Sequence, residues 1–225
     1  MKKTPILFLL FSGLLLAAPI ARAADEPPMP LVSNPPANAE ILWNGRDIAG
    51  WTVFLKDASV DPKSVWSIDA GTLRLTGTPF GYLRSVKTYS NYYLHAEWRY
   101  PADATASANS GVFIHVHDKD NIWPSGIECQ LHAGEAGQLI ATNVDIPSAP
   151  LIRGKKRASP TGPHAEKPFG EWNSYDIFCR GDTVEVYVNG VLENHVEKIT
   201  VSSGSIALQL EGIVIQFRNV WLAPL

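Results

Sequence analysis

The chain has 225 residues, of which 45% are hydrophobic, so it can form a packed core. Only 18% of the residues are charged, and the 17 glycines and 17 prolines favour strands and turns over long surface helices. The formal net charge of −3 argues against a nucleic-acid-binding protein, which needs a basic surface.

Residues 1–23 have the pattern of a secretory signal peptide. A basic start precedes an apolar run from Pro5 to Ile20, and Ala21-Arg22-Ala23 is a small-x-small cleavage site. A membrane anchor is the alternative, but the apolar run is shorter than the ~20 residues that a membrane span requires. We therefore expect a periplasmic or secreted protein with no membrane span in its mature form.

Residues 24–38 are predicted to be a proline-rich linker, and residues 39–225 a single domain. Five prolines favour extended backbone in the linker. The domain shows short strands and turns, without a convincing helical period. Asp69–Gly71 and Asn189-Gly190 are predicted hairpin turns, because Asn and Gly accept positive φ angles. This pattern predicts an all-β fold, a two-sheet sandwich or jelly roll. The clearest strands are 65–68, 72–75, 92–100, 110–117, 126–132, 172–179, 183–188, 205–210 and 214–222.

Residues 141–170 depart from this pattern of short strands and turns, because they form a long connection that shows no strand pattern. The segment contains five prolines and a basic group between Arg153 and Arg157. Connections of this length in compact domains are usually functional or disordered. Two interpretations stay open, a solvated surface segment and a lid that brings cations over a site.

The two cysteines, Cys129 and Cys179, both lie in apolar, strand-like stretches. A domain of this size does not need a disulfide for its stability. We therefore predict two buried free thiols, with a single disulfide as the alternative.

Three predicted strands carry polar side chains at alternate positions, which places those side chains on one face of each strand. If the three strands are neighbours, the polar rows form one concave patch of imidazoles, carboxylates and a guanidinium. Such clusters are where catalytic groups gather. The rows consist of Glu128, Gln130 and His132, which follow Trp123; of Phe113, His115 and His117; and of Tyr93, His95, Glu97 and Arg99.

Three chemistries compete for this patch. A metal site is one alternative, so a divalent metal stays open as a cofactor; its ligands would be His115, His117, Glu128 and His132. A conventional glycosidase needs two carboxylates about 5–10 Å apart, and the Glu128 strand offers no second acid. General acid–base catalysis by Glu128 and His132 on an activated substrate fits the pattern better.

Seven segments, taken together and in order, resemble the 3-keto-disaccharide hydrolase domain family, and the resemblance extends from about residue 41 to residue 225. The segments are Leu42–Trp51 (LWNGRDIAGW), Trp66–Leu73 (WSIDAGTL), Asn109–Ile114 (NSGVFI), Gly126–Leu131 (GIECQL), Gly170–Tyr175 (GEWNSY), Val188–Gly190 (VNG) and Phe217–Val220 (FRNV).

The resemblance implies a concanavalin-like jelly roll that acts on glycosides whose C3 hydroxyl has been oxidised to a ketone. A C3 ketone acidifies the C2 proton, so one base can form an enolate that expels the C1 leaving group, and water can then add. The family's Asn-Ser-Gly and Glu-x-Gln segments carry over to Asn109–Gly111, Glu128 and Gln130.

The expected function is therefore cleavage of oxidised glycosides, with a carbohydrate as the partner. A lectin-like carbohydrate-binding module is the alternative, because jelly rolls also carry binding sites built from aromatic and polar side chains. The candidate catalytic residues are Glu128, His132 and His115, and the candidate substrate-binding residues are Gln130, Arg99, Asn109, Glu97 and Trp123.

Overall fold

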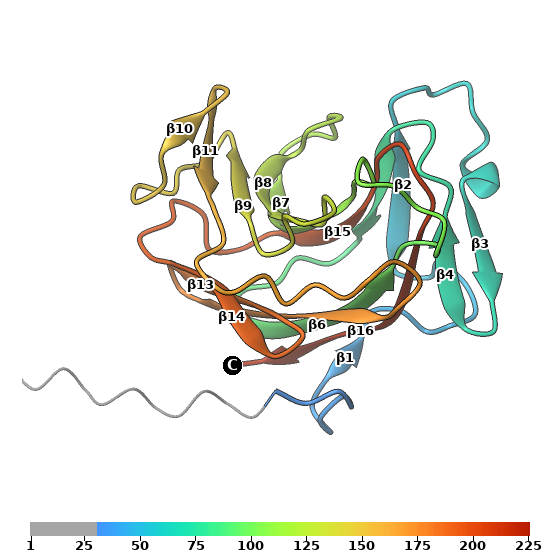
Figure 1. Cartoon of the computed structure of the whole chain (residues 1–225). Helices are drawn as coiled ribbons and strands as arrows, with labels where there is room; N and C mark the ends of the chain where they lie inside the picture. Colours follow the sequence, from blue (N-terminus) through green and yellow to red (C-terminus); the bar gives the residue numbers. More distant parts are fainter. Residues whose placement is uncertain (1–30) are drawn as a thin grey trace, which may run out of the picture. The chain divides into compact units, whose positions relative to one another are not determined.

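Two antiparallel sheets stack face to face in the computed structural model, which describes residues 31–225 (Figure 1). Apart from the short 3-10 helix η1 (Pro62–Ser64), the regular elements of these residues are strands. The predicted signal peptide and the first part of the predicted linker lie outside the described residues. Among the described residues, no helix is long and apolar enough to cross a membrane.

The first sheet contains eight strands and occupies the lower layer in Figure 1. Its spatial order is β14 (Val191–Val196), β13 (Thr183–Val188), β12 (Asn173–Arg180), β6 (Tyr92–Arg99), β16 (Ile215–Pro224), β4 (Thr72–Leu75) and β3 (Trp66–Asp69), with β1 (Glu40–Ile41) also paired to β16.

The second sheet also contains eight strands, and its two ends rise away from the first sheet, so that its outer face is concave (Figure 1). Its order is β10 (Leu151–Ile152), β11 (Lys155–Ala158), β9 (Leu139–Thr142), β8 (Ser125–Gln130), β7 (Gly111–His117), β15 (Ser205–Leu210), β5 (Gly81–Ser85) and β2 (Trp51–Leu55).

The core lies between the sheets and is built from alternate residues of each strand, as the period of a strand dictates. From the first sheet, Leu94, Ala96 and Trp98 of β6 are fully buried, and from the second sheet Ile127 and Cys129 of β8 pack against the same cluster. The predicted all-β, two-sheet architecture is confirmed.

A bulge in β7 changes which side chains face the core. Three residues of β15, Ser205–Ala207, oppose four residues of β7, Phe113–Val116. His115 adopts a φ of 54° within this bulge. An extra residue reverses the alternation of a strand. Val116 therefore joins Phe113 in a cluster separate from the main core, and His115 turns inward.

Both predicted hairpin turns are present, since Ala70 and Gly71 join β3 to β4 and Asn189 and Gly190 join β13 to β14, all with positive φ. The prediction that residues 141–170 contain no strand is wrong. The hairpin of β10 and β11 lies in this segment and extends the second sheet beside β9.

The two cysteines are free and buried in the core, in agreement with the predicted thiols. Burial also raises the pKa of both thiols.

Candidate active site

Glu128 lies at the centre of the second sheet, between Phe113 of β7 and Ile140 of β9. Its neighbours along β8 face the core, so the Glu128 side chain faces the concave side, where only 4% of the residue is exposed. Burial raises the pKa of Glu128 to about 8, and repulsion by Glu211 acts in the same direction. This carboxyl is therefore a stronger base than an ordinary glutamate.

Gly111 makes room for this carboxyl, and the Gln209 side chain forms a hydrogen bond with it. A Cβ on Gly111 would lie 2.9 Å from Oε1 of Glu128 and 3.0 Å from Oε1 of Gln209. The neighbouring Ser110 donates a hydrogen bond from Oγ to the Gln209 carbonyl at 2.8 Å, which joins β7 to β15. The Asn-Ser-Gly segment thus shapes the space that the Glu128 side chain occupies.

A second carboxylate comes from Glu211, directly after β15. Burial raises its pKa, while a hydrogen bond from the Asn109 side chain and the charge of Lys155 oppose this shift. As predicted, the Glu128 strand supplies no second acid, but the fold brings one from a distant segment. The signal in the sequence was Gln209, a polar residue within the otherwise apolar end of a predicted strand.

Lys155 and Arg157 bring positive charge to the same side of the sheet. Lys155 and Arg157 occupy alternate positions of β11, so both side chains lie on the face of the sheet that carries Glu128. Their positive charges oppose the rise of the Glu128 pKa. Nζ of Lys155 lies 5.0 Å from the centre of the Trp123 ring, and Arg157 donates to Oε1 of Gln138 at 3.0 Å. This arrangement favours the interpretation of the basic segment as a supplier of cations to a site.

Gln130 and His132 lie at the end of β8. Oε1 of Gln130 accepts hydrogen bonds from the backbone N–H groups of Leu131 and His132, both at 2.8 Å. Gln130 therefore shapes the chain end that carries His132. The charge of His132 affects both Glu211 and Glu166, so its ring lies near the carboxylates.

His115 is not part of this site, which corrects its assignment as a catalytic residue. The bulge in β7 turns its ring into the core, where the side chain is fully buried and packs edge-on against Tyr92. Burial lowers the pKa of His115 to about 4, so the ring is neutral at pH 7. The four predicted metal ligands are consequently not brought together. Within residues 31–225, no group of three or more His, Cys, Asp or Glu side chains could hold a metal ion.

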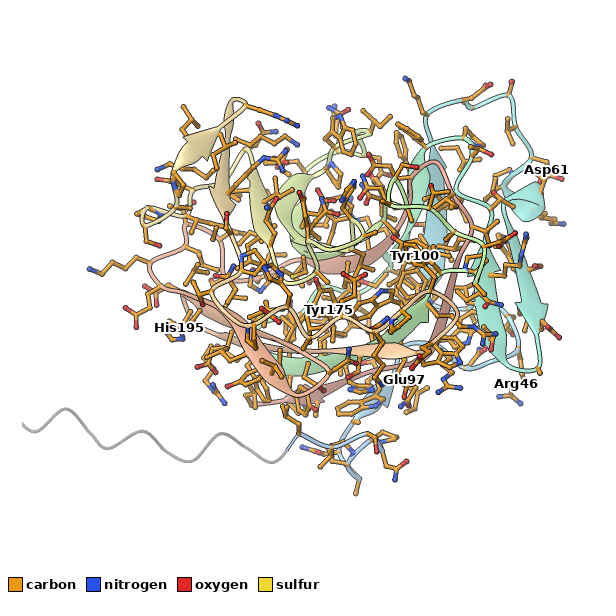
Figure 2. The ribbon with its side chains drawn as sticks, in the orientation of Figure 1. Arg46, Asp61, Glu97, Tyr100, Tyr175 and His195 are labelled. Carbon is orange, nitrogen blue, oxygen red and sulfur yellow. The ribbon has the colours of Figure 1, made fainter. Side chains whose placement is uncertain are left out.

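Glu97 and Arg99 also lie elsewhere, which corrects their assignment to the substrate site. Their strand, β6, belongs to the first sheet and is not a neighbour of β7 or β8. Figure 2 shows Glu97 on the side of the molecule that carries β6 and β16, whereas Tyr100 and Tyr175 lie between the sheets. Nε of Arg99 donates to Oε1 of Gln216 at 2.6 Å on that remote face.

The concave face of the second sheet, called the cleft below, thus combines two carboxyls whose pKa values are raised by burial, two cations, an amide and an indole. It can remove a proton, return a proton and stabilise a developing negative charge. Of the predicted site residues it contains Glu128, Asn109, Trp123 and His132, with Gln130 beside it.

Known proteins resemble this chain in sequence and in fold. A 3-keto-disaccharide hydrolase from Bacteroides thetaiotaomicron is 26% identical over 175 residues, which cover 69% of this chain. This chain spans only 58% of the length of that relative.

Solved structures show the same fold. A candidate glycosyl hydrolase from Parabacteroides distasonis superposes with a TM-score of 0.62 at 21% identity, over 84% of this chain and 94% of that one. The β-glucanase of Bacillus licheniformis gives a TM-score of 0.57 at 14% identity, over 82% and 96% of the two chains. The family model of the 3-keto-alpha-glucoside-1,2-lyase-like domain matches residues 38–223. This chain therefore belongs to the family of 3-keto-alpha-glucoside-1,2-lyase-like domains.

Proposed function

We propose that this protein cleaves glycosides whose C3 hydroxyl has been oxidised to a ketone, with an overall result of hydrolysis. The observation that carries the proposal is the buried Glu128 carboxyl, whose pKa is raised to about 8 and which faces Lys155 and Arg157. The family and the name of the curated relative support the same class of substrate.

In the first step, Glu128 removes the proton at C2, and the electron pair of the C–H bond forms an enolate with the C3 carbonyl. Its raised pKa suits this step, because a stronger base accepts a proton from carbon more readily. Lys155 and Arg157 stabilise the enolate oxygen by charge.

In the second step, the enolate reforms the ketone, a double bond forms between C1 and C2, and the C1–O bond breaks. Glu211 is suited to protonate the leaving oxygen, because burial raises its pKa and keeps a proton on it more often. Water then adds across the double bond, with the hydroxyl at C1 and hydrogen at C2. The sum of these steps is hydrolysis.

Glu211 also favours a second candidate function. A conventional glycosidase uses two carboxylates in one cleft as its catalytic residues and needs no ketone in the substrate. The two functions differ in their substrates, since only a conventional enzyme cleaves the unoxidised parent glycoside.

The test is incubation of the purified protein with a 3-keto-glucoside and with its parent glucoside, both in D₂O. We expect release of the aglycone from the ketone alone, with deuterium at C2 of the released sugar. Cleavage of the parent, or cleavage without label at C2, would contradict the enolate mechanism. Binding of both compounds without turnover would favour the lectin-like alternative.

A further inference from the structure

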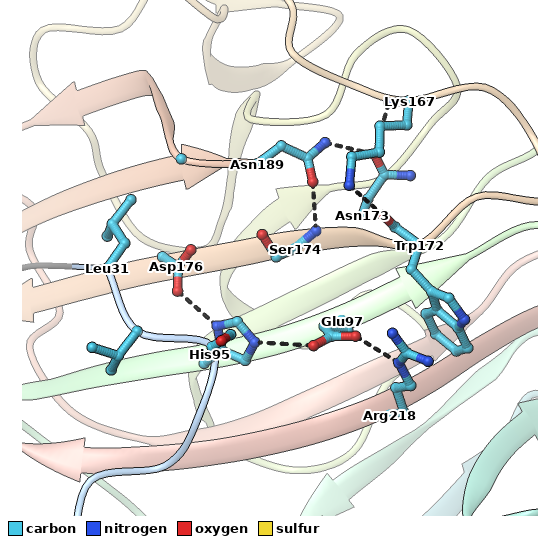
Figure 3. A pocket seen from close by; sticks show the side chains of 13 residues that line it. Leu31, His95, Glu97, Lys167, Trp172, Asn173, Ser174, Asp176, Asn189 and Arg218 are labelled. Atoms are coloured by element: carbon cyan, nitrogen blue, oxygen red, sulfur yellow. Dashed lines mark hydrogen bonds and ion pairs between the residues drawn. The ribbon is translucent and has the colours of Figure 1, made fainter.

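A pocket of about 320 Å³ lies on the outer face of the first sheet, on the side of the molecule away from the Glu128 cleft. This volume is at the lower end of the range of small-molecule sites, roughly 300–1,000 Å³. Figure 3 shows the residues that line it, and all of them belong to the described part of the chain. The cleft chemistry uses none of these residues.

The floor of this pocket is a chain of ionisable side chains from three adjacent strands. Oδ1 of Asp176 on β12 accepts from Nδ1 of His95 on β6 at 2.7 Å, and Nε2 of His95 lies 3.7 Å from Oε1 of Glu97. Nε of Arg218 on β16 donates to Oε2 of Glu97 at 2.6 Å. The dashed lines in Figure 3 trace this chain. Burying such groups on an outer face costs free energy, so they are unusual there without a function.

Two polar atoms at the pocket have no hydrogen-bond partner within residues 31–225. Oδ1 of Asp176 accepts two hydrogen bonds, from Tyr93 and His95, whereas Oδ2 of Asp176 accepts none. The Ser174 hydroxyl, two residues away on the same face of β12, is likewise unpaired, although its backbone N–H donates to Asn189. The pocket therefore offers both acceptors and donors to a ligand.

The charge and the apolar wall of the pocket restrict the kind of ligand. Two carboxylates, Asp176 and Glu97, are balanced by Arg218 and by Lys167, so the pocket has no strong net sign. Leu31 and Val32 form an apolar wall beside them. A neutral molecule with many hydroxyl groups and an apolar C–H surface matches this combination.

Trp172 also lines the pocket, but its ring already contacts two guanidinium groups. The centre of the ring lies 4.0 Å from Cζ of Arg218 and 4.7 Å from Cζ of Arg99. A sugar ring would therefore bind by hydrogen bonds to the floor rather than by stacking on the indole face. Trp172 remains close enough to report on occupancy.

We propose that this pocket is a second saccharide-binding site, which holds one or two neutral sugar units on the face opposite the cleft. The site requires the hydroxyl of Ser174 and the free oxygen of Asp176. It does not depend on the chemistry proposed for Glu128. This second site would keep the protein bound to a glycan during and between reactions in the cleft.

Sucrose, an uncharged disaccharide without a C3 ketone, is the probe, with calorimetry and the indole N–H signal of Trp172 in NMR as the readouts. The variant Ser174→Val fills the pocket with methyl groups, and Ser67→Val, an exposed position on β3 of the same sheet, is the matched control. Glu128→Gln alters only the cleft. Asp176→Asn, which keeps the shape of the side chain, replaces Ser174→Val if that variant does not fold.

We expect saturable binding that Ser174→Val weakens by about tenfold or more, while Ser67→Val and Glu128→Gln bind as the parent protein does. Absence of saturable binding would overturn the proposal. So would binding that Glu128→Gln abolishes and Ser174→Val leaves intact, because the sugar would then occupy the cleft. Sulfate binding in place of sucrose would contradict the neutral class of ligand.

Discussion

Gly111 faces Glu128 so closely that a single methyl group at Gly111 would clash with the Glu128 side chain. The added Cβ would lie 2.9 Å from both Cγ and Oε1 of Glu128. Gly111 has ordinary strand backbone in β7, so space alone requires glycine at this position. The placement of the proposed base thus depends on the absence of a side chain on the neighbouring strand.

Gly111→Ala is therefore expected to reduce activity strongly by displacing Glu128, and to cost about 1–3 kcal/mol of stability through overpacking. Aglycone release and thermal unfolding measure the two effects. Gly50→Ala is the control, since a Cβ there meets nothing within 4 Å although the positive φ strains it. Full activity of Gly111→Ala would show that the position of Glu128 is unimportant.

Glu128→Gln is expected to abolish turnover and to change how stability depends on pH. Burial raises the pKa of Glu128 from 4.5 to about 8, so the folded protein holds a proton that the unfolded chain releases at lower pH. The free energy of unfolding of the parent should therefore fall relative to that of Glu128→Gln as the pH rises from 4.5 to 8. Denaturant unfolding at a series of pH values measures this difference, and parallel curves would contradict the raised pKa.

The activity of the parent enzyme should also depend on the protonation of Glu128, but it should rise with pH where the stability falls. Only the deprotonated Glu128 can accept the C2 proton, so kcat/KM should rise with pH, pass its half-maximal value near pH 8 and level off above it. Initial rates of aglycone release across this range are the measurement. A rate that falls steadily between pH 6 and 8 would instead indicate that Glu128 acts as an acid.

Lys155→Met is expected to lower kcat by about 100-fold, because it removes a cation that stabilises the enolate. Lys156→Met is a matched control on the same strand. The Lys156 side chain points to the other face of β11, where Nζ donates to the Ala149 carbonyl at 2.9 Å. Equal rates for the two variants would remove Lys155 from the mechanism.

The exported protein is expected to begin near Ala24, after the Ala21-Arg22-Ala23 site, and to carry no lipid, since no cysteine lies near the cleavage point. Mass spectrometry of protein recovered from the periplasm or the medium checks this prediction. Retention of residues 1–23 in the recovered protein would disprove the proposed export route.

The sequence predicted the strands better than it predicted their neighbours. Alternation along each strand correctly places Glu128 opposite Ile127 and Cys129, because alternation is local. Pairing between strands is not local, and the polar row of β6 therefore lies in the other sheet. No pattern within β6 distinguishes these two arrangements.

A specific structural reason explains each residue that the sequence analysis misplaced or missed. His115 turns into the core because one extra residue in β7 reverses the alternation, and nothing in the run from Gly111 to His117 marks where a bulge begins. Glu211 was missed because Gln209 is the only polar residue in the second half of the strand before it, and that residue does not show which strand lies beside β15. Its contact with Asn109 depends on β15 lying beside β7.

The arrangement of the cleft limits how its activity can be transferred to another protein. Glu128, Lys155 and Glu211 come from three parts of the chain, and the curved sheet alone brings them together. Transferring one hairpin to a different β-sandwich would therefore move only some of the proposed catalytic residues. The smallest transferable unit is the curved sheet with the order of its strands intact.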